Sequence, residues 1–143
     1  MAARTREVDG LMLAVIALGG GIGALLRYGT SLVVPEAGGI PWQTLAVNAI
    51  GCLAIGVLMA VITEFRSAHR LVRPFLGVGV LGGFTTFSTY AVEVRRLLES
   101  GRMATAFGYL GGTVMISLGA VVLGLGATRW AVRTARRLGA GDE

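Results

Sequence analysis

The chain has 143 residues, of which 54% are hydrophobic and only 15% are charged, and its formal net charge is +5. Soluble domains carry roughly 25% charged residues, so this composition excludes an ordinary soluble domain and indicates an integral membrane protein. The 13 basic residues are all arginines, mostly at the ends of apolar segments, which excludes the basic, aromatic-lined surface of a nucleic-acid binder.

Four apolar segments are long enough to cross a bilayer, which takes about 20 residues in a helix. They are Leu11–Val34, Trp42–Phe65, Val72–Leu98 and Met103–Ala127. These segments use nearly the whole chain, so we predict one all-α membrane domain over residues 1–143. The short connections favour antiparallel neighbours in an up-down arrangement. The polar tail from residue 133 onward is expected to be frayed.

The first span contains a run of small residues, Gly19–Ala24, that formally fits the dinucleotide-binding pattern G-x-G-x-x-A. That fingerprint requires alternating strands and helices, which this chain lacks. We interpret Gly19 and Gly23, four residues apart, as a seam for close helix packing. The same spacing predicts close contacts, within or between subunits, at Gly79/Gly83 and Gly108/Gly112.

Polar residues stand out near the end of the first span and inside the second. Arg27 either snorkels to the interface or acts as a charge that tethers a helix end or draws anions toward a vestibule. Asn48 must find partners, because an unsatisfied amide in hydrocarbon is costly. It is expected to bond a neighbouring helix or to face a functional path. Thr44 lies one turn earlier on the same face.

The third span is interrupted by the run Gly-Gly-Phe-Thr-Thr-Phe-Ser-Thr-Tyr at residues 82–90. Non-helical backbone survives at membrane depth only where it is buried in protein or lines a wet cavity, so a break near residues 82–86 predicts an ion or substrate site. Phe84, Phe87 and Tyr90 recur every three residues, which predicts that their rings gather on one face, where ring edges attract anions. Glu93 either pairs with a nearby arginine or lies at a pore mouth.

The fourth span carries hydroxyl residues at every fourth position, namely Thr105, Tyr109, Thr113 and Ser117. This spacing predicts a stripe along one helix face. A lone hydroxyl often bonds its own helix, but four in register indicate an uncharged polar track. Because the sequence offers no nucleophile with a base, no paired carboxylates in a cleft and no phosphate loop, we do not expect an enzyme.

The arginines favour one orientation. An even number of crossings places both termini on one side, and positive charge tends to stay cytoplasmic. Nine arginines fall on the side of the termini: Arg4, Arg6, Arg66, Arg70, Arg73, Arg129, Arg133, Arg136 and Arg137. Four fall on the other: Arg27, Arg95, Arg96 and Arg102. Both termini are therefore expected to face the cytoplasm.

Three motifs in the same order resemble those of the Fluc, or CrcB-type, fluoride channels over nearly the full length. They are GGIGALLRY at residues 20–28, TLAVNAIGC at 44–52 and GGFTTFSTY at 82–90. The resemblance implies an antiparallel, dual-topology homodimer of four-helix subunits in a bacterial cytoplasmic membrane, with two fluoride pores along the subunit interface. It also implies passive export of fluoride that is trapped in the cytosol after neutral hydrogen fluoride has entered and dissociated.

The resemblance carries residue roles to matching positions. It implies a pore lined by Asn48, Thr44, Phe87, Tyr90, Tyr109, Thr113 and Ser117, a vestibule carboxylate at Glu93 and a buried structural arginine at Arg27. The backbone carbonyls of Gly82 and Thr85 would hold a sodium ion shared across the dimer axis. Tyr90 stands where the family commonly has phenylalanine, so its hydroxyl would either donate to fluoride or narrow or reroute the path.

Three alternatives remain open at this stage. The arginine asymmetry is large for a subunit that inserts both ways, so the chain is either a homodimer subunit or one of two oppositely oriented paralogues. A small multidrug-type transporter is also four-helical and dimeric, but it usually needs a membrane-embedded carboxylate, and the first span has none. In a non-transporting assembly factor, the polar residues would serve helix packing alone.

Overall fold

The computed structural model describes residues 10–34, 39–64 and 70–139, and within these ranges the ordered elements are all helical. They are α1 (Gly10–Val33), α2 (Trp42–Glu64), the π-helical segment η1 (Arg73–Leu81), α3 (Gly82–Phe84), α4 (Ser88–Glu99) and α5 (Met103–Gly139). By length and composition these form four candidate membrane spans, the third of which combines η1, α3 and α4. The predicted end of the second span, Phe65, lies outside the described residues.

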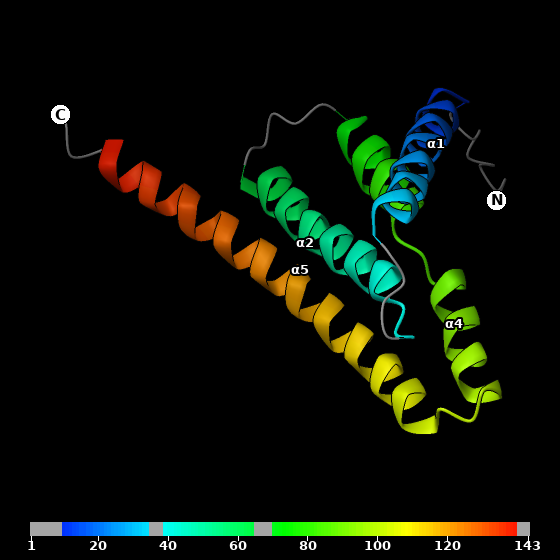
Figure 1. The fold of residues 1–143 in the computed structure, drawn as a ribbon. Helices are drawn as coiled ribbons and strands as arrows, with labels where there is room; N and C mark the ends of the chain where they lie inside the picture. The colour runs from blue at the N-terminus through cyan, green and yellow to red at the C-terminus, as the bar shows by residue number, and fades with distance from the viewer. Residues whose placement is uncertain (1–9, 35–38, 65–69, 140–143) are drawn as a thin grey trace, which may run out of the picture.

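The helices form two pairs rather than a bundle around one core (Figure 1). α2 packs along α5, while α1 packs along η1 and α3, and α4 bridges to the first half of α5. Few large side chains are buried, whereas long rows of leucine, valine and isoleucine are exposed on the outside. A surface of this kind requires lipid or a second protein subunit against it.

Glycine brings α1 against the third span. A Cβ atom on Gly23 would lie 2.7 Å from the amide nitrogen of Phe84, and one on Gly19 would lie 3.0 Å from the Cα atom of Gly79. Real Cβ atoms require more room, and backbone atoms cannot swing aside as side chains do. The predicted seam at Gly19 and Gly23 is therefore confirmed, and its partner is the predicted pair Gly79/Gly83.

Glycines also allow the backbones of α2 and α5 to contact each other closely. The four-residue glycine spacing used in the sequence analysis did not predict this contact. A Cβ atom on Gly56 would lie 3.0 Å from the amide nitrogen of Leu125, and Gly124 meets the backbone of α2 in return. These two glycines belong to different helices, so no regular spacing within one helix points to them. In contrast, the Gly108/Gly112 pair has open space around it in this subunit; a close contact there does not form within the subunit, and a contact between subunits stays a prediction.

The break in the third span begins three residues later than predicted. Gly82 and Gly83 are helical, and the backbone turns extended at Thr85, with φ −73° and ψ 155°. Helix resumes at Ser88. The predicted grouping of three rings is therefore wrong, because helical spacing does not carry across the break: Phe84 lies before it and packs near Gly51 of α2.

α5 continues well beyond the predicted end of the fourth span. It has 37 residues and reaches Gly139, whereas the sequence predicted a span ending at Ala127 and a frayed tail. Residues 127–138 contain alanine, arginine and leucine, which are strong helix formers, and neither glycine nor proline. The end is also fixed to α2, since Arg136 forms an ion pair with Glu64 at 3.3 Å.

We predict that Gly23→Ala destabilises the protein by about 1–3 kcal/mol, because the methyl group meets backbone of the third span. The measurement is the free energy of unfolding in detergent. Gly21→Ala is the matched control, since the Cβ atom there has open space and alanine favours helix by about 1 kcal/mol over glycine. Equal stability of the two variants would contradict the close packing of α1.

Candidate functional site

Asn48 closes the break in the third span by pairing with its backbone. The Nδ2 atom of Asn48 donates to the carbonyl oxygen of Thr86 at 2.9 Å, and the Thr86 amide donates to Asn48 Oδ1 at 2.8 Å. Asn48 is buried in α2. The Asn48 side chain thus hydrogen-bonds both the amide and the carbonyl oxygen of Thr86, which belongs to no helix. Buried peptide groups require such partners.

Two further contacts hold the break in place. Arg27 Nε donates to the carbonyl oxygen of Gly83 at 3.2 Å, so this arginine tethers α1 to the end of α3, one of the roles left open by the sequence. The amide of Thr89 donates to Thr86 Oγ1 at 3.2 Å. Thr86 therefore acts as a side-chain cap for the first turn of α4.

These contacts release two carbonyl oxygens of the break from helical bonding. In a continuous helix, the Gly82 and Thr85 carbonyls would accept from the amides of Thr86 and Thr89. Those amides instead donate to Asn48 Oδ1 and Thr86 Oγ1. Carbonyl oxygens that lose these amide partners are suitable ligands for a hard cation, and these are the two positions at which the family resemblance implies a sodium ion.

Glu93 joins α4 to both α2 and α5. Its Oε1 atom accepts from the Thr44 hydroxyl at 2.7 Å, and its Oε2 atom accepts from the Tyr109 hydroxyl at 2.7 Å. Arg95, one of the expected partners, bonds Glu99 instead at 2.7 Å. Arg95 is therefore not the partner of Glu93, because α4 turns Arg95 outward while Glu93 faces the two hydroxyls.

Three aromatic rings form a row from the break toward α5. The centroids of Phe87 and Tyr90 lie 5.6 Å apart, and those of Tyr90 and Tyr109 lie 5.4 Å apart, with tilted planes. Such tilted packing is favourable because the edge of one ring carries partial positive charge. The Tyr90 hydroxyl donates to the carbonyl oxygen of Leu110 at 2.6 Å. It therefore bonds α5 in this subunit rather than projecting as an unpaired donor.

The hydroxyl stripe of α5 is unevenly buried. Tyr109 and Thr113 are each 4% exposed, while Thr105 and Ser117 are half-buried. Thr113 Oγ1 is a buried side-chain oxygen with no hydrogen-bond partner among the described residues. Because Thr113 lies one turn beyond Tyr109, its hydroxyl extends the polar line that begins at Glu93.

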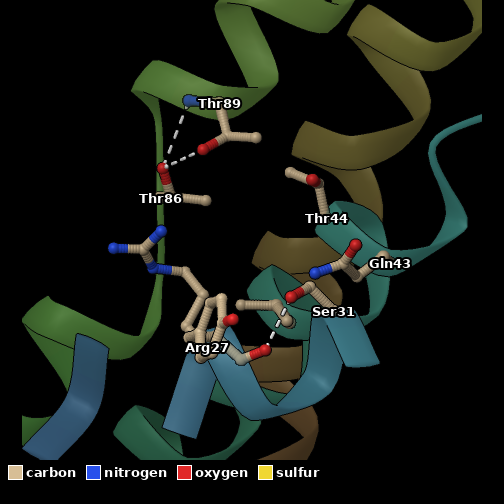
Figure 2. A pocket seen from close by; sticks show the side chains of 8 residues that line it. Arg27, Ser31, Gln43, Thr44, Thr86 and Thr89 are labelled. Atoms are coloured by element: carbon tan, nitrogen blue, oxygen red, sulfur yellow. Dashed lines mark hydrogen bonds between the residues drawn. The ribbon is translucent and has the colours of Figure 1, made fainter. Parts of the chain in front are cut away.

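A cavity of about 130 Å³ opens beside the break, between α1, α2 and the start of α4. Figure 2 shows its labelled polar residues, which are Arg27, Ser31, Gln43, Thr44, Thr86 and Thr89. Thr44 is shared, because it lines the cavity and also donates to Glu93. The sequence did not single out Ser31 and Gln43, since polar residues near the ends of membrane spans are common and carry no distinctive spacing.

Comparison with known proteins decides the family. Residues 14–125 match the family described as "CrcB-like protein, Camphor Resistance (CrcB)". The chain belongs to this family. A protein of Nocardia farcinica named "Fluoride-specific ion channel FluC 2" is 58% identical over 136 residues, which cover 94% of this chain and 97% of that protein.

Two Streptomyces relatives are similarly close. "Fluoride-specific ion channel FluC 1" of Streptomyces coelicolor is 60% identical over 119 residues, or 82% of this chain and 77% of that protein. "Fluoride-specific ion channel FluC 2" of Streptomyces avermitilis is 57% identical over 104 residues, or 72% of this chain and 66% of that protein. The resemblance inferred from the three sequence motifs is thereby confirmed.

We predict that Asn48→Ala lowers the free energy of unfolding by about 2–4 kcal/mol, because two backbone groups of Thr86 lose their partner. Unfolding in detergent measures this. Thr63→Val is the matched control on α2, since its hydroxyl bonds only Met59 of its own helix. If Asn48→Ala is as stable as the control, the side chain does not hold the break.

Proposed function

We propose that the protein is a fluoride-selective channel, rather than an enzyme, in a bacterial cytoplasmic membrane, and that fluoride leaves the cytosol through it passively. Membership of the CrcB-like family and the names of the relatives support the ion. Four candidate spans support a multi-pass membrane protein. The observation within the subunit that carries the proposal is the unpartnered hydroxyl of Thr113.

That hydroxyl differs from ordinary threonines in these helices. Thr63, Thr128 and Thr134 each donate to the carbonyl four residues earlier in their own helix, at 2.7, 2.8 and 3.0 Å. This is the usual way in which a helix accommodates a hydroxyl. Thr113 is buried yet has no such bond among the described residues. A buried donor without a partner is costly, unless it serves a transient ligand.

Hydroxyls, an amide and aromatic ring edges suit a small, strongly hydrated anion. A channel must replace water around the ion without binding it so tightly that it cannot leave. Moderate donors and ring edges do this at several sites. We assign the path to Asn48, Thr44, Phe87, Tyr90, Tyr109, Thr113 and Ser117.

The charged groups take positions at the ends of this path. Arg27 lines the cavity beside the break, where a positive charge would concentrate anions from solution. Its Nε atom is held by Gly83, so the guanidinium stays at the cavity rather than inside the path. Glu93 accepts hydrogen bonds from the hydroxyls of Thr44 and Tyr109, so in this proposal its carboxylate stands where the donor line along α5 begins.

We propose that two subunits enclose this path. Phe87 is 78% exposed on the single subunit, and the neighbouring hydroxyl of Ser88 is exposed as well. Polar groups at membrane depth must be covered by protein or lie in water, and a partner against the break would cover both. The family resemblance favours an antiparallel homodimer, and an oppositely oriented paralogue is the other partner to be tested.

A sodium ion would be held by the Gly82 and Thr85 carbonyls, paired with those of the second subunit. It would supply positive charge near the break, where carbonyl oxygens otherwise repel anions. The residues of this chain position those oxygens through Asn48 and Thr86, whose bonds withdraw the competing amides.

A small multidrug-type transporter is a weaker alternative. Proton-coupled transporters of that kind use a carboxylate in the membrane. α1 contains no acidic residue, and Glu93 is engaged by two hydroxyls. A purely structural role for the polar residues predicts instead that loss of the Thr113 hydroxyl leaves fluoride efflux unchanged.

The sharpest test compares Thr113→Val with Thr128→Val on the same helix. Valine keeps the shape of threonine and removes the hydroxyl. We expect Thr113→Val to fold as well as the parent, since an unpaired buried group is removed, but to lower fluoride efflux from liposomes by about tenfold, equivalent to roughly 1.4 kcal/mol. Thr128→Val should leave efflux unchanged. Parental efflux in Thr113→Val would remove this residue from the path.

A second prediction concerns the exposed ring. Phe87→Ile should leave the subunit fold intact, because little of the side chain is buried within one subunit, and should strongly reduce fluoride efflux by removing ring edges. Efflux and gel filtration of the same preparation measure the two effects. Normal efflux through a folded Phe87→Ile protein would assign the aromatic role elsewhere.

A further inference from the structure

The last turns of α5, residues 127–139, form an amphipathic helix. At 100° per residue, the side chains of Arg129, Arg133, Arg136 and Arg137 fall on one continuous side of the helix. Trp130 and Leu138 fall on the adjoining side, which is completed by alanines and threonines. Trp130 and Leu138 are each 71% exposed. A basic side next to an apolar side with tryptophan is typical of helices that lie at a lipid interface.

This segment lies beside the C-terminal end of α2. Arg136 pairs with Glu64, the last residue of α2, so the tail lies level with and beyond the end of that span (Figure 1). Arg133 and Arg137 are exposed and Arg129 is half-buried. α5 itself contains no acidic residue, and within the part of the chain that the structure describes, the ion pair with Glu64 engages one of the four arginines.

We infer that Arg129, Arg133 and Arg137, together with Trp130, bind the headgroups of anionic phospholipids. Guanidinium groups match phosphate oxygens in a bidentate geometry, and tryptophan prefers the headgroup level. A cluster of basic residues directly after a membrane span attracts anionic lipid. A phospholipid also has acyl chains that the exposed side chains of Trp130 and Leu138 can contact. A soluble phosphate has none, so this apolar side favours a lipid as the ligand. This site is separate from the path assigned to fluoride.

Trp130 itself reports on the site. The chain has two tryptophans, so Trp42→Phe leaves Trp130 alone. This full-length protein is placed in vesicles of phosphatidylcholine and phosphatidylglycerol, with bromine on the acyl chains of one lipid or the other at equal mole fraction. We expect brominated phosphatidylglycerol to quench Trp130 at least about twofold more than brominated phosphatidylcholine, and this ratio to fall with added salt.

Arginine variants in the same background identify the residues responsible. Arg129→Gln/Arg133→Gln/Arg137→Gln should bring the quenching ratio close to one, whereas the matched control Arg95→Gln/Arg96→Gln, at the far end of the third span, should keep it. Equal quenching by the two lipids in the parent protein would overturn the inference. So would an unchanged ratio in the folded triple variant, or loss of the ratio on adding glycerol phosphate at constant ionic strength, which would indicate a site for soluble phosphate.

Discussion

The hydrogen bonding of a non-helical peptide inside the membrane is the constraint on which the rest of this structure depends. The third span is interrupted at Thr85–Phe87, where lipid offers no partner for free backbone groups. Asn48 supplies both a donor and an acceptor to Thr86. Once this pairing is made, the position of α2 relative to the third span is fixed, and with it the surroundings of Thr44 and Glu93.

The glycine contacts follow from the same requirement. Because α1 packs backbone to backbone against the third span, Arg27 comes within reach of the Gly83 carbonyl. On the other side, Gly56 and Gly124 draw α2 against α5, while the Tyr109 hydroxyl of α5 bonds Glu93 of α4. Polar groups from all four spans thus collect between the two helix pairs, while the outside remains apolar.

Sequence reasoning predicted the spans and the polar positions better than their contacts. Hydropathy finds membrane helices because length and composition alone determine them. The break lies later than predicted, because both glycines of residues 82–83 are helical and Gly83 packs closely against Gly20 of α1. The partner of Glu93 could not be predicted either, since a tyrosine and a threonine on two other helices must first be brought together by the fold.

The length of α5 shows a second limit of hydropathy. The apolar stretch of α5 ends where the arginines begin, and hydropathy therefore predicts the end of the span there. The helix continues, because the following residues also favour helix and Arg136 forms an ion pair with Glu64. The basic tail also bears on how the subunit inserts. Its arginines favour one orientation of the subunit in the membrane. An antiparallel homodimer needs subunits in both orientations, so the tail opposes the dual insertion on which that dimer depends.

The most direct test is ion release from liposomes that contain this purified chain alone. The liposomes are loaded with potassium fluoride or potassium chloride, valinomycin cancels the charge movement, and ion-selective electrodes follow efflux. Rapid fluoride release without chloride release is the predicted result, and it would show that one kind of chain forms the channel. Equal release of the two anions, or no fluoride release from folded and inserted protein, would contradict a fluoride-selective homodimeric channel.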